Sequence, residues 1–159
     1  MLIAVSIAAT GLASAQIVAL GHSAVRGGVA ENEMWPAVLE GMLRARGSQL
    51  HVTNAGVWGE TIKATLARVS SAVPDGTKIV ILATNGYNDA HKLTEGSVNA
   101  AANIAAIKSQ LKARGIRIVD AMEIVRSVLH QPDMSLPDGI HLNVEGNRRV
   151  ATRLVGSVR

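Results

Sequence analysis

The chain alternates short apolar runs with longer segments in which apolar residues recur at helical spacing. Short apolar runs bounded by turn residues are typical of buried strands, whereas apolar residues at every third or fourth position are typical of helices that cover a sheet. Strands are predicted in the apolar run that opens 17–23 and at 49–54, 78–83 and 116–120. Helices are predicted at 33–46, 61–71, 97–114, 122–129 and 144–155, the last capped by Asn143.

The order of these elements, strand then helix in repetition, predicts the fold class. The run Lys78–Ala83 (K-I-V-I-L-A) is apolar without interruption after its first residue, which is typical of a central parallel strand buried on both faces. We therefore predict a single α/β domain with a parallel sheet and helices on both faces. Ligands of such sheets bind outside the carboxyl ends of the strands, so the polar residues that follow each strand are the candidates for a site.

Composition and charge narrow the classes of partner. Hydrophobic residues make up 48 % of the 159 residues, and the aromatic residues are only Trp35, Trp58 and Tyr87. The net charge is +4, but the basic residues are dispersed and the longest basic run is Arg148-Arg149. This pattern lacks the basic patch of a nucleic-acid-binding protein. The absence of cysteine excludes disulfides, thiol catalysis and cysteine-based zinc sites.

Residues 1–15 form an uncharged, apolar segment that ends in Ala13-Ser14-Ala15. Such a segment with a small-x-small end is typical of a secretory signal cleaved after Ala15, although the usual basic residues before it are absent. We predict that the mature domain spans 16–159 and is periplasmic or secreted. The alternatives are an apolar N-terminal helix of a cytoplasmic protein, or a single membrane span, which Gly11 and the interspersed Ser and Thr residues disfavour.

The polar residues at the predicted strand ends include the parts of a serine-based acyl-transfer site. Such a site needs a nucleophile, a base, a group that orients the base, and donors aimed at the oxyanion. Ser23 follows the first strand in Gly-His-Ser, and Asp138 and His141 lie three residues apart before the last helix. Gly56 offers a backbone N–H that a ligand can approach closely, and Asn88 offers a side-chain amide near the end of the central strand.

Four stretches in this order resemble the SGNH, or GDSL-type, hydrolase family. They are G-H-S at 21–23, N-A-G-V-W-G-E-T at 54–61, G-Y-N-D at 86–89 and D-G-I-H-L-N at 138–143. The resemblance spans the whole predicted domain. It implies a three-layer α/β/α fold of flavodoxin-like character and hydrolysis of esters, thioesters or acetylated sugars without a metal or other cofactor.

The resemblance also implies a role for each matching residue. Ser23 is the nucleophile, His141 the general base, and Asp138 the residue that orients the imidazole. The oxyanion hole consists of the N–H of Ser23, the N–H of Gly56 and the side chain of Asn88. The sequence departs from the family at His22, where an Asp that braces the nucleophile loop is usual. A histidine can also donate or accept a hydrogen bond there, but its charge depends on pH near neutrality.

Three residues are candidates for lining the substrate pocket: His22, Trp58 and Tyr87. Trp58 and Tyr87 flank the predicted site loops and could bind an acyl group or a sugar, and the alternative for both is packing in the core. The remaining histidines, His51, His91 and His130, are expected at the surface or at an edge.

Each candidate also has a purely structural alternative. A lone Gly-x-Ser is usually a turn, Asp138-Gly139 is a common turn pair, and Gly56 could serve only to shape a tight turn. Asn88-Asp89 could cap a helix, and Asp89 is expected to be structural. An Asp-x-x-His pair can also bind a metal, but no second cluster supplies further ligands at a recognisable spacing, so no metal site is predicted.

We therefore predict a serine hydrolase that cleaves carboxylic esters or thioesters through an acyl-enzyme on Ser23. Its partner is a small acyl ester, thioester or acetylated sugar, with no nucleic acid and no stable membrane span. One alternative is a domain of the same fold that has lost catalysis and binds a carbohydrate or an acyl ligand. A second alternative keeps the chemistry but acts on sugars, as an O-acetyl transferase or esterase.

Overall fold

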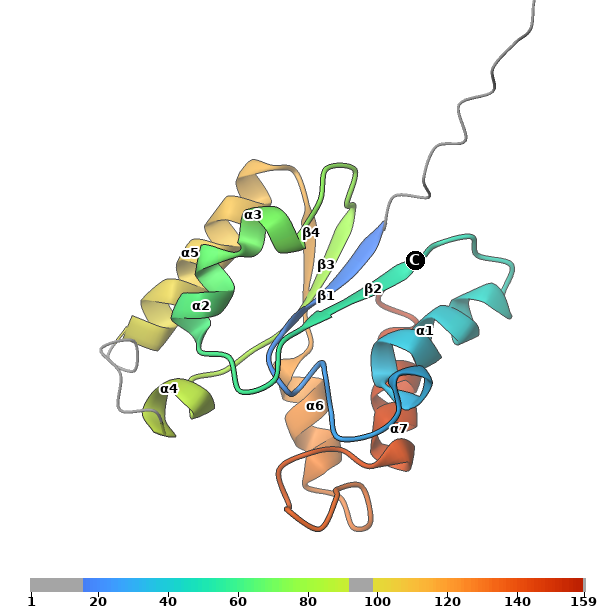
Figure 1. Ribbon diagram of the computed structural model, residues 1–159. Helices are drawn as coiled ribbons and strands as arrows, with labels where there is room; N and C mark the ends of the chain where they lie inside the picture. The colour runs from blue at the N-terminus through green and yellow to red at the C-terminus, as the bar shows by residue number, and fades with distance from the viewer. Residues whose placement is uncertain (1–15, 92–98, 159) are drawn as a thin grey trace, which may run out of the picture.

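A computed structural model describes residues 16–91 and 99–158, and these residues form an α/β fold around one parallel sheet (Figure 1). The sheet order is β2-β1-β3-β4, with every neighbouring pair parallel. The strands are β1 (Ile17–Gly21), β2 (Val52–Gly56), β3 (Ile79–Ala83) and β4 (Arg117–Asp120). Gly21 is level with Gly56 on one side and with Ala83 on the other, so the carboxyl ends of β2, β1 and β3 meet at one edge of the sheet.

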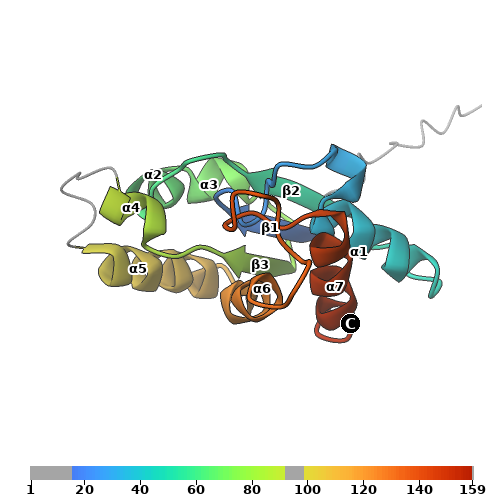
Figure 2. The same cartoon turned by 90° about the horizontal axis from the view of Figure 1, so that it is seen from below.

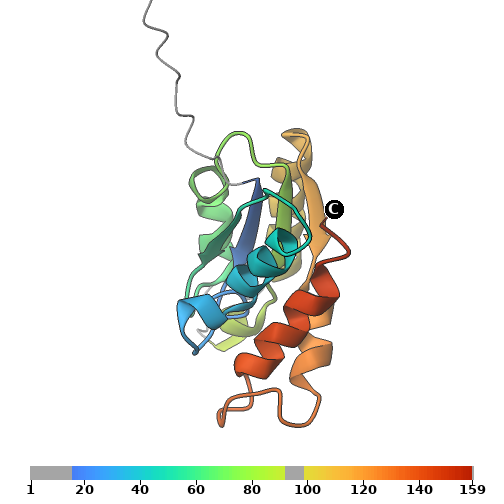
Figure 3. The ribbon, with the colours of Figure 1, turned by 90° about the vertical axis from the view of Figure 1, so that its right-hand side faces the viewer.

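Helices cover both faces of the sheet, as predicted (Figures 1, 2 and 3). One face packs against α1 (Trp35–Arg44), α6 (Met122–Leu129) and α7 (Val144–Leu154). The other face packs against α2 (Ile62–Ala67), α3 (Val69–Ala72) and α5 (Ala100–Ala113). Alternate residues of each strand point to opposite faces. In β1, for example, Ile17 and Ala19 join the first core, and Val18 and Leu20 the second.

Two predicted elements differ from the observed ones for tertiary reasons. The predicted helix 61–71 is interrupted at Arg68, whose side chain turns toward the sheet, donates to Glu60 and bonds the carbonyl oxygens of Gly21 and Ala55. The predicted strand 49–54 is shifted to Val52–Gly56, where it pairs residue by residue with β1.

Two short helices were not predicted: α4 (Tyr87–His91) and the 3-10 helix η1 (Glu31–Glu33). The start of the helix predicted from residue 33 is moved to Trp35, with Pro36 in its first turn. The predicted cap of the last helix is confirmed, because the side chain of Asn143 accepts the N–H of Gly146 at 2.9 Å.

The predicted signal segment, 1–15, lies outside the described residues, as do the first two residues of the helix predicted at 97–114. Among the residues that the structure describes, no helix is both long and apolar enough to cross a membrane.

Candidate active site

The Ser23 turn, residues 21–26, lies at the carboxyl end of β1. The carbonyl oxygen of His22 accepts hydrogen bonds from the N–H groups of Val25, at 2.9 Å, and Arg26, at 3.2 Å, which closes a tight turn around Ser23. Ser23 is half-buried and lines a pocket. Within residues 16–91 and 99–158, neither its N–H nor its hydroxyl forms a hydrogen bond with the protein. Both groups are therefore available to a ligand.

Two glycines let this turn lie close over the sheet. A Cβ atom on Gly56 would stand 2.7 Å from the backbone nitrogen of Arg26, and one on Gly21 would collide with the carbonyl of Ala83. A side chain at Gly56 would push the Ser23 turn away, and one at Gly21 would push β1 away from β3. Glycine at these two strand ends therefore allows the turn to approach β2 and β1 to approach β3.

Asp138 and His141 form a hydrogen-bonded pair in the Asp–His loop, residues 138–141. Oδ2 of Asp138 lies 2.6 Å from Nδ1 of His141, and Oδ1 accepts the backbone N–H groups of Ile140 and His141, each at 3.0 Å. The hydrogen bond from the His141 side chain, aided by those from the backbone, lowers the pKa of Asp138 from 3.8 to about 2. The ionised carboxylate holds the proton on Nδ1, so the lone pair of the neutral ring is on Nε2.

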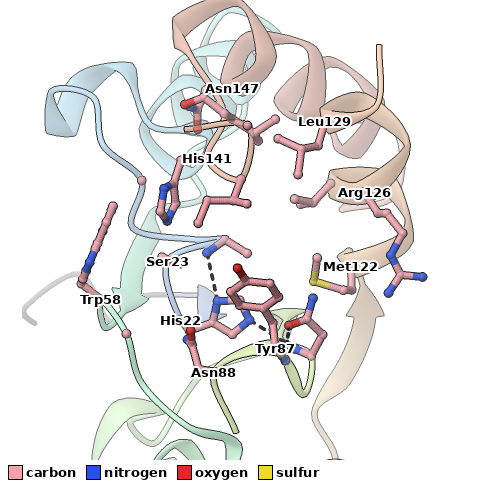
Figure 4. A pocket seen from close by; sticks show the side chains of 18 of the residues that line it. His22, Ser23, Trp58, Tyr87, Asn88, Met122, Arg126, Leu129, His141 and Asn147 are labelled. Atoms are coloured by element: carbon pink, nitrogen blue, oxygen red, sulfur yellow. Dashed lines mark hydrogen bonds between the residues drawn. The ribbon is translucent and has the colours of Figure 1, made fainter. Parts of the chain in front are cut away.

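Trp58 covers one face of this imidazole. The two rings are stacked with their centroids 4.3 Å apart and their planes at 26°. The indole itself is 54 % exposed, whereas the side chain of His141 is only 10 % exposed. Figure 4 shows Trp58, His141 and Ser23 on the same side of the pocket. The alternative that Trp58 packs in the core is therefore wrong.

His22 lies beneath the Ser23 turn and is only 5 % exposed. Its Nδ1 is 3.2 Å from the backbone nitrogen of Ala24, and its Nε2 is 3.3 Å from that of Asn85, in the segment after β3. Burial lowers the pKa of His22 below its ordinary value of 6.5. A hydrogen bond with the Asn85 side chain raises this pKa, but by less than burial lowers it. The ring is therefore neutral at neutral pH.

The other predicted oxyanion donors are partly engaged. The side-chain nitrogen of Asn88 donates to the carbonyl oxygen of Glu60 at 2.9 Å, and an amide nitrogen has a second hydrogen to donate. The N–H of Gly56 donates to Oδ1 of Asn54 at 3.0 Å. Asn88 lines the pocket, whereas Gly56 is not among the lining residues. In the stretch 54–61 the glycine that lines the pocket is Gly59, whose φ is +66°.

Buried charges anchor the segments that carry these donors. Asp89 is fully buried and its carboxylate accepts the N–H of Ile62, the first residue of α2, which confirms that Asp89 is structural. Glu60 and Arg68 form an ion pair at 2.6 Å whose two side chains are mostly buried. These contacts tie the segments after β2 and β3 to each other and to α2.

The pocket at this edge of the sheet has a volume of about 430 Å³. Its polar side includes His22, Ser23, Asn88 and His141, together with Asn85, which was not predicted from the sequence. Tyr87 also lines it and is exposed, so core packing is wrong for this residue too; its ring stacks on His91 at 4.0 Å.

The wall opposite Ser23 comes from α6 and was not predicted (Figure 4). Met122, Val125 and Leu129 line it, and Arg126 and His130 also face the pocket. The three apolar residues recur at helical spacing, which is the signal that could have indicated a wall. The structure thus places an apolar surface across the pocket from the Ser23 turn.

The described residues contain no group of three or more His, Asp or Glu side chains placed to hold a metal ion. The hydroxyl and imidazole groups that line the pocket can perform proton transfer through Nε2 of His141 and attack by the Ser23 hydroxyl.

No protein-family model matches the sequence, and neither does any curated protein. Solved structures do match it. TesA superposes with a TM-score of 0.77 at 16 % identity, over 90 % of this chain and 97 % of its own. The psychrotrophic esterase EstA from Pseudoalteromonas sp., inhibited by monoethylphosphonate, gives a TM-score of 0.72 at 17 % identity, over 89 % and 95 % of the two chains.

AlinE4, an esterase of the SGNH-hydrolase family, gives a TM-score of 0.63 at 24 % identity, over 89 % of this chain and 93 % of its own. The predicted fold class is therefore confirmed: over nearly its whole length, this chain has the fold of SGNH hydrolases.

Proposed function

We propose that this chain, which has the SGNH hydrolase fold, is a serine hydrolase that cleaves carboxylic esters or thioesters through an acyl-enzyme on Ser23. The observation that carries the proposal is that His141, paired with Asp138, lines the same pocket as a serine whose hydroxyl has no hydrogen bond within the described residues, with an apolar wall across the pocket. A serine, an oriented imidazole and a carboxylate are the groups that this chemistry requires.

The reaction begins when Nε2 of His141 takes the hydroxyl proton of Ser23 while Oγ bonds to the carbonyl carbon of the substrate. The tetrahedral intermediate then expels the alcohol or thiol, which receives that proton from Nε2. A water molecule repeats the sequence: Nε2 takes its proton, its oxygen attacks the acyl carbon, and Ser23 leaves with the proton. Ser23 and Nε2 share no hydrogen bond in the structure, and we expect this bond to form when substrate binds.

The oxyanion that develops in both steps needs donors. The N–H of Ser23 and the second amide hydrogen of Asn88 supply them without breaking a bond seen in the structure. The N–H of Gly56 can contribute only if the oxyanion shares or replaces the Oδ1 of Asn54 as its acceptor. We therefore give Ser23 and Asn88 the larger part of the stabilisation, each worth about 3 kcal/mol.

The comparisons support ester chemistry without deciding the leaving group. EstA and AlinE4 are esterases, and another structure with this fold is an acetyl xylan esterase, with a TM-score of 0.57 at 17 % identity. The wall formed by Met122, Val125 and Leu129 favours substrates whose acyl group is apolar. We therefore propose that acyl esters or thioesters with an aliphatic chain are better substrates than acetylated sugars.

A panel of p-nitrophenyl esters and acyl thioesters of increasing chain length tests the proposal. We expect hydrolysis by the wild-type chain, a rise in kcat/KM from acetyl to longer acyl groups, and loss of turnover in Ser23→Ala. Ser109→Ala is the matched control, because Ser109 is exposed on α5, on the far face of the sheet. Turnover that survives in Ser23→Ala, or absence of hydrolysis by folded wild-type protein, would contradict the proposal.

A further inference from the structure

His22 is a buried, titratable side chain that the reaction steps above do not use. It stands between the two segments that carry the nucleophile and the amide donor: the Ser23 turn after β1, and the segment 84–88 after β3. Figure 4 shows the ring below Ser23, with its hydrogen bonds drawn toward both segments. The two ring nitrogens therefore connect two parts of the site that lie more than sixty residues apart in sequence.

The chemistry of the ring decides which nitrogen carries the proton. Two backbone N–H groups approach it, that of Ala24 at Nδ1 and that of Asn85 at Nε2, but a neutral imidazole can accept at only one nitrogen. The side chain of Asn85 also forms a hydrogen bond with the ring, and this bond raises the pKa of His22. If Nδ1 accepts from Ala24, Nε2 carries a hydrogen that it can donate to the Asn85 amide oxygen, so both ring nitrogens are used.

Asn85 passes this connection on toward the amide donor. Its Oδ1 also accepts the N–H of Tyr87 at 3.1 Å, in the first turn of α4, and Asn88 is the next residue. The resulting chain runs from the N–H of Ala24 through the His22 ring to Asn85 and Tyr87. Every link is a hydrogen bond, and the ring is screened from water.

We propose that His22, as the neutral Nε2–H tautomer, is a positioning residue that holds the Ser23 turn and the Asn88 segment in register, and that its protonation stops acyl transfer. The inference rests on the proposed function of Ser23 and deepens it. A carboxylate at this position could accept the backbone N–H groups of Ala24 and Asn85, but it has no hydrogen to donate to the Asn85 side chain. Histidine at position 22 differs from the usual aspartate of the family in supplying that donor and in titrating near neutral pH.

Protonation removes the lone pair that accepts from Ala24, so the charged ring has no acceptor for either backbone N–H group that approaches it. Burial lowers the pKa of His22, the Asn85 hydrogen bond and the charges of Asp89 and Glu60 raise it, and that of His141 lowers it. Because the net shift is downward from 6.5, the neutral form predominates at neutral pH, and the link is lost as pH falls through the lowered pKa. His141 must also be unprotonated to act as the base.

The pH dependence of kcat/KM tests this role, because activity at acid pH then requires both His22 and His141 to be unprotonated. In a plot of log kcat/KM against pH, we expect the acid limb of the wild type to approach a slope of about two. His22→Asn keeps an acceptor for Ala24 but does not titrate, so its acid limb should have a slope of about one. At neutral pH, loss of the link to Asn85 should lower its kcat about two- to tenfold, the effect of one hydrogen bond.

His51→Asn is the matched control, since His51 is exposed and paired with Glu40 away from the pocket; its profile should match that of the wild type. An acid limb of the same slope in His22→Asn as in the wild type would overturn the proposal.

Nitrogen-15 NMR of the histidine rings at neutral pH gives a second readout that needs no activity. We expect His22 to be neutral, with the proton on Nε2. A proton on Nδ1, or a charged ring, would overturn the proposal. A chain with the expected tautomer that hydrolyses no ester would instead contradict the proposed function, so the two failures are distinguishable.

Discussion

The Asp–His loop and the Ser23 turn meet at the same pocket but are built in different ways. In the Asp–His loop, Asp138 makes three hydrogen bonds to residues two and three positions away, and all of them lie within 138–141. The Ser23 turn depends instead on distant residues: Gly56, whose Cα it packs against, and Asn85, which the His22 side chain contacts. The Asp–His loop is therefore the local half of the site, and the Ser23 turn is its tertiary half.

The Ser23 turn is the more sensitive of the two to changes elsewhere in the molecule. A locally closed loop keeps its geometry if the surrounding packing changes slightly, whereas a turn held from three strand ends moves with each of them. We therefore expect mutations far from Ser23 to change the nucleophile more than they change the base.

His141→Ala breaks the local half and should have the largest effect. It removes the base and leaves the Ser23 turn in place, so kcat should fall by about 10⁴-fold or more.

Asp138→Asn keeps the loop but loses the charge that holds the proton on Nδ1 of His141, so kcat should fall by about 10²- to 10⁴-fold. Steady-state kinetics with a p-nitrophenyl ester measures both. Wild-type kcat in a folded His141→Ala chain would contradict the role of His141.

Asn88→Ala acts on a donor that the tertiary half positions. Loss of one oxyanion donor should lower kcat by about 10²- to 10³-fold, with little change in KM, because the donor acts mainly in the transition state. Asn99→Ala is a suitable control, since Asn99 precedes α5 and its side chain makes no capping hydrogen bond. A rise in KM at unchanged kcat would show that Asn88 binds substrate instead.

Gly56→Ala breaks the contact between β2 and the Ser23 turn. The new Cβ would lie 2.7 to 2.9 Å from atoms of Val25 and Arg26, so the turn must move, and the free energy of unfolding should fall by about 1 to 3 kcal/mol. Activity should fall with it, because the displaced turn carries Ser23.

Gly41→Ala provides the comparison for Gly56→Ala. Gly41 lies within α1, and apart from its chain neighbours and the backbone of its own helix nothing lies within 4 Å of an added Cβ, so this change should stabilise the chain by about 0.5 to 1 kcal/mol. Chemical denaturation measures both variants. Equal stability of Gly56→Ala and the wild type would show that the turn does not depend on this contact.

Trp58→Ala tests whether the local half also needs a distant residue, and its effect should be the smallest. The stacked indole stabilises the imidazolium that forms during the reaction by about 0.5 to 1 kcal/mol, so kcat should fall about two- to fivefold. Trp58→Phe should recover most of this loss. Val57→Ala, which removes a neighbouring exposed side chain outside the pocket lining, should have wild-type kcat. A Trp58→Phe chain as slow as Trp58→Ala would contradict this role of the aromatic ring.

The same distinction between local and tertiary contacts explains how much of the fold could be predicted. The uninterrupted apolar run of β3 and the helical spacing of α6 are local signals, and both elements were predicted. The break at Arg68 was not, because it arises from an ion pair with Glu60 and from bonds to two strand ends. The shift of β2 likewise reflects its pairing with β1.

In the site, the spacing of Asp138 and His141 already indicated a pair, and the structure brings them into contact. Sequence could not show that the N–H of Gly56 is engaged by Asn54, nor that His22 reaches Asn85, because both depend on how distant backbone segments approach. The apolar wall of α6 was visible as a helical stripe, but only the packing of α6 over the sheet shows that the stripe faces Ser23.

Covalent labelling by a fluorophosphonate, followed by mass spectrometry of the intact chain and its peptides, tests most directly whether the two halves act together on Ser23. We expect one phosphonyl group per chain, attached to Ser23, with labelling absent in Ser23→Ala and strongly slowed in His141→Ala. A folded wild-type chain that stays unlabelled, or that is labelled at a different residue, would contradict the assignment of Ser23 as the nucleophile.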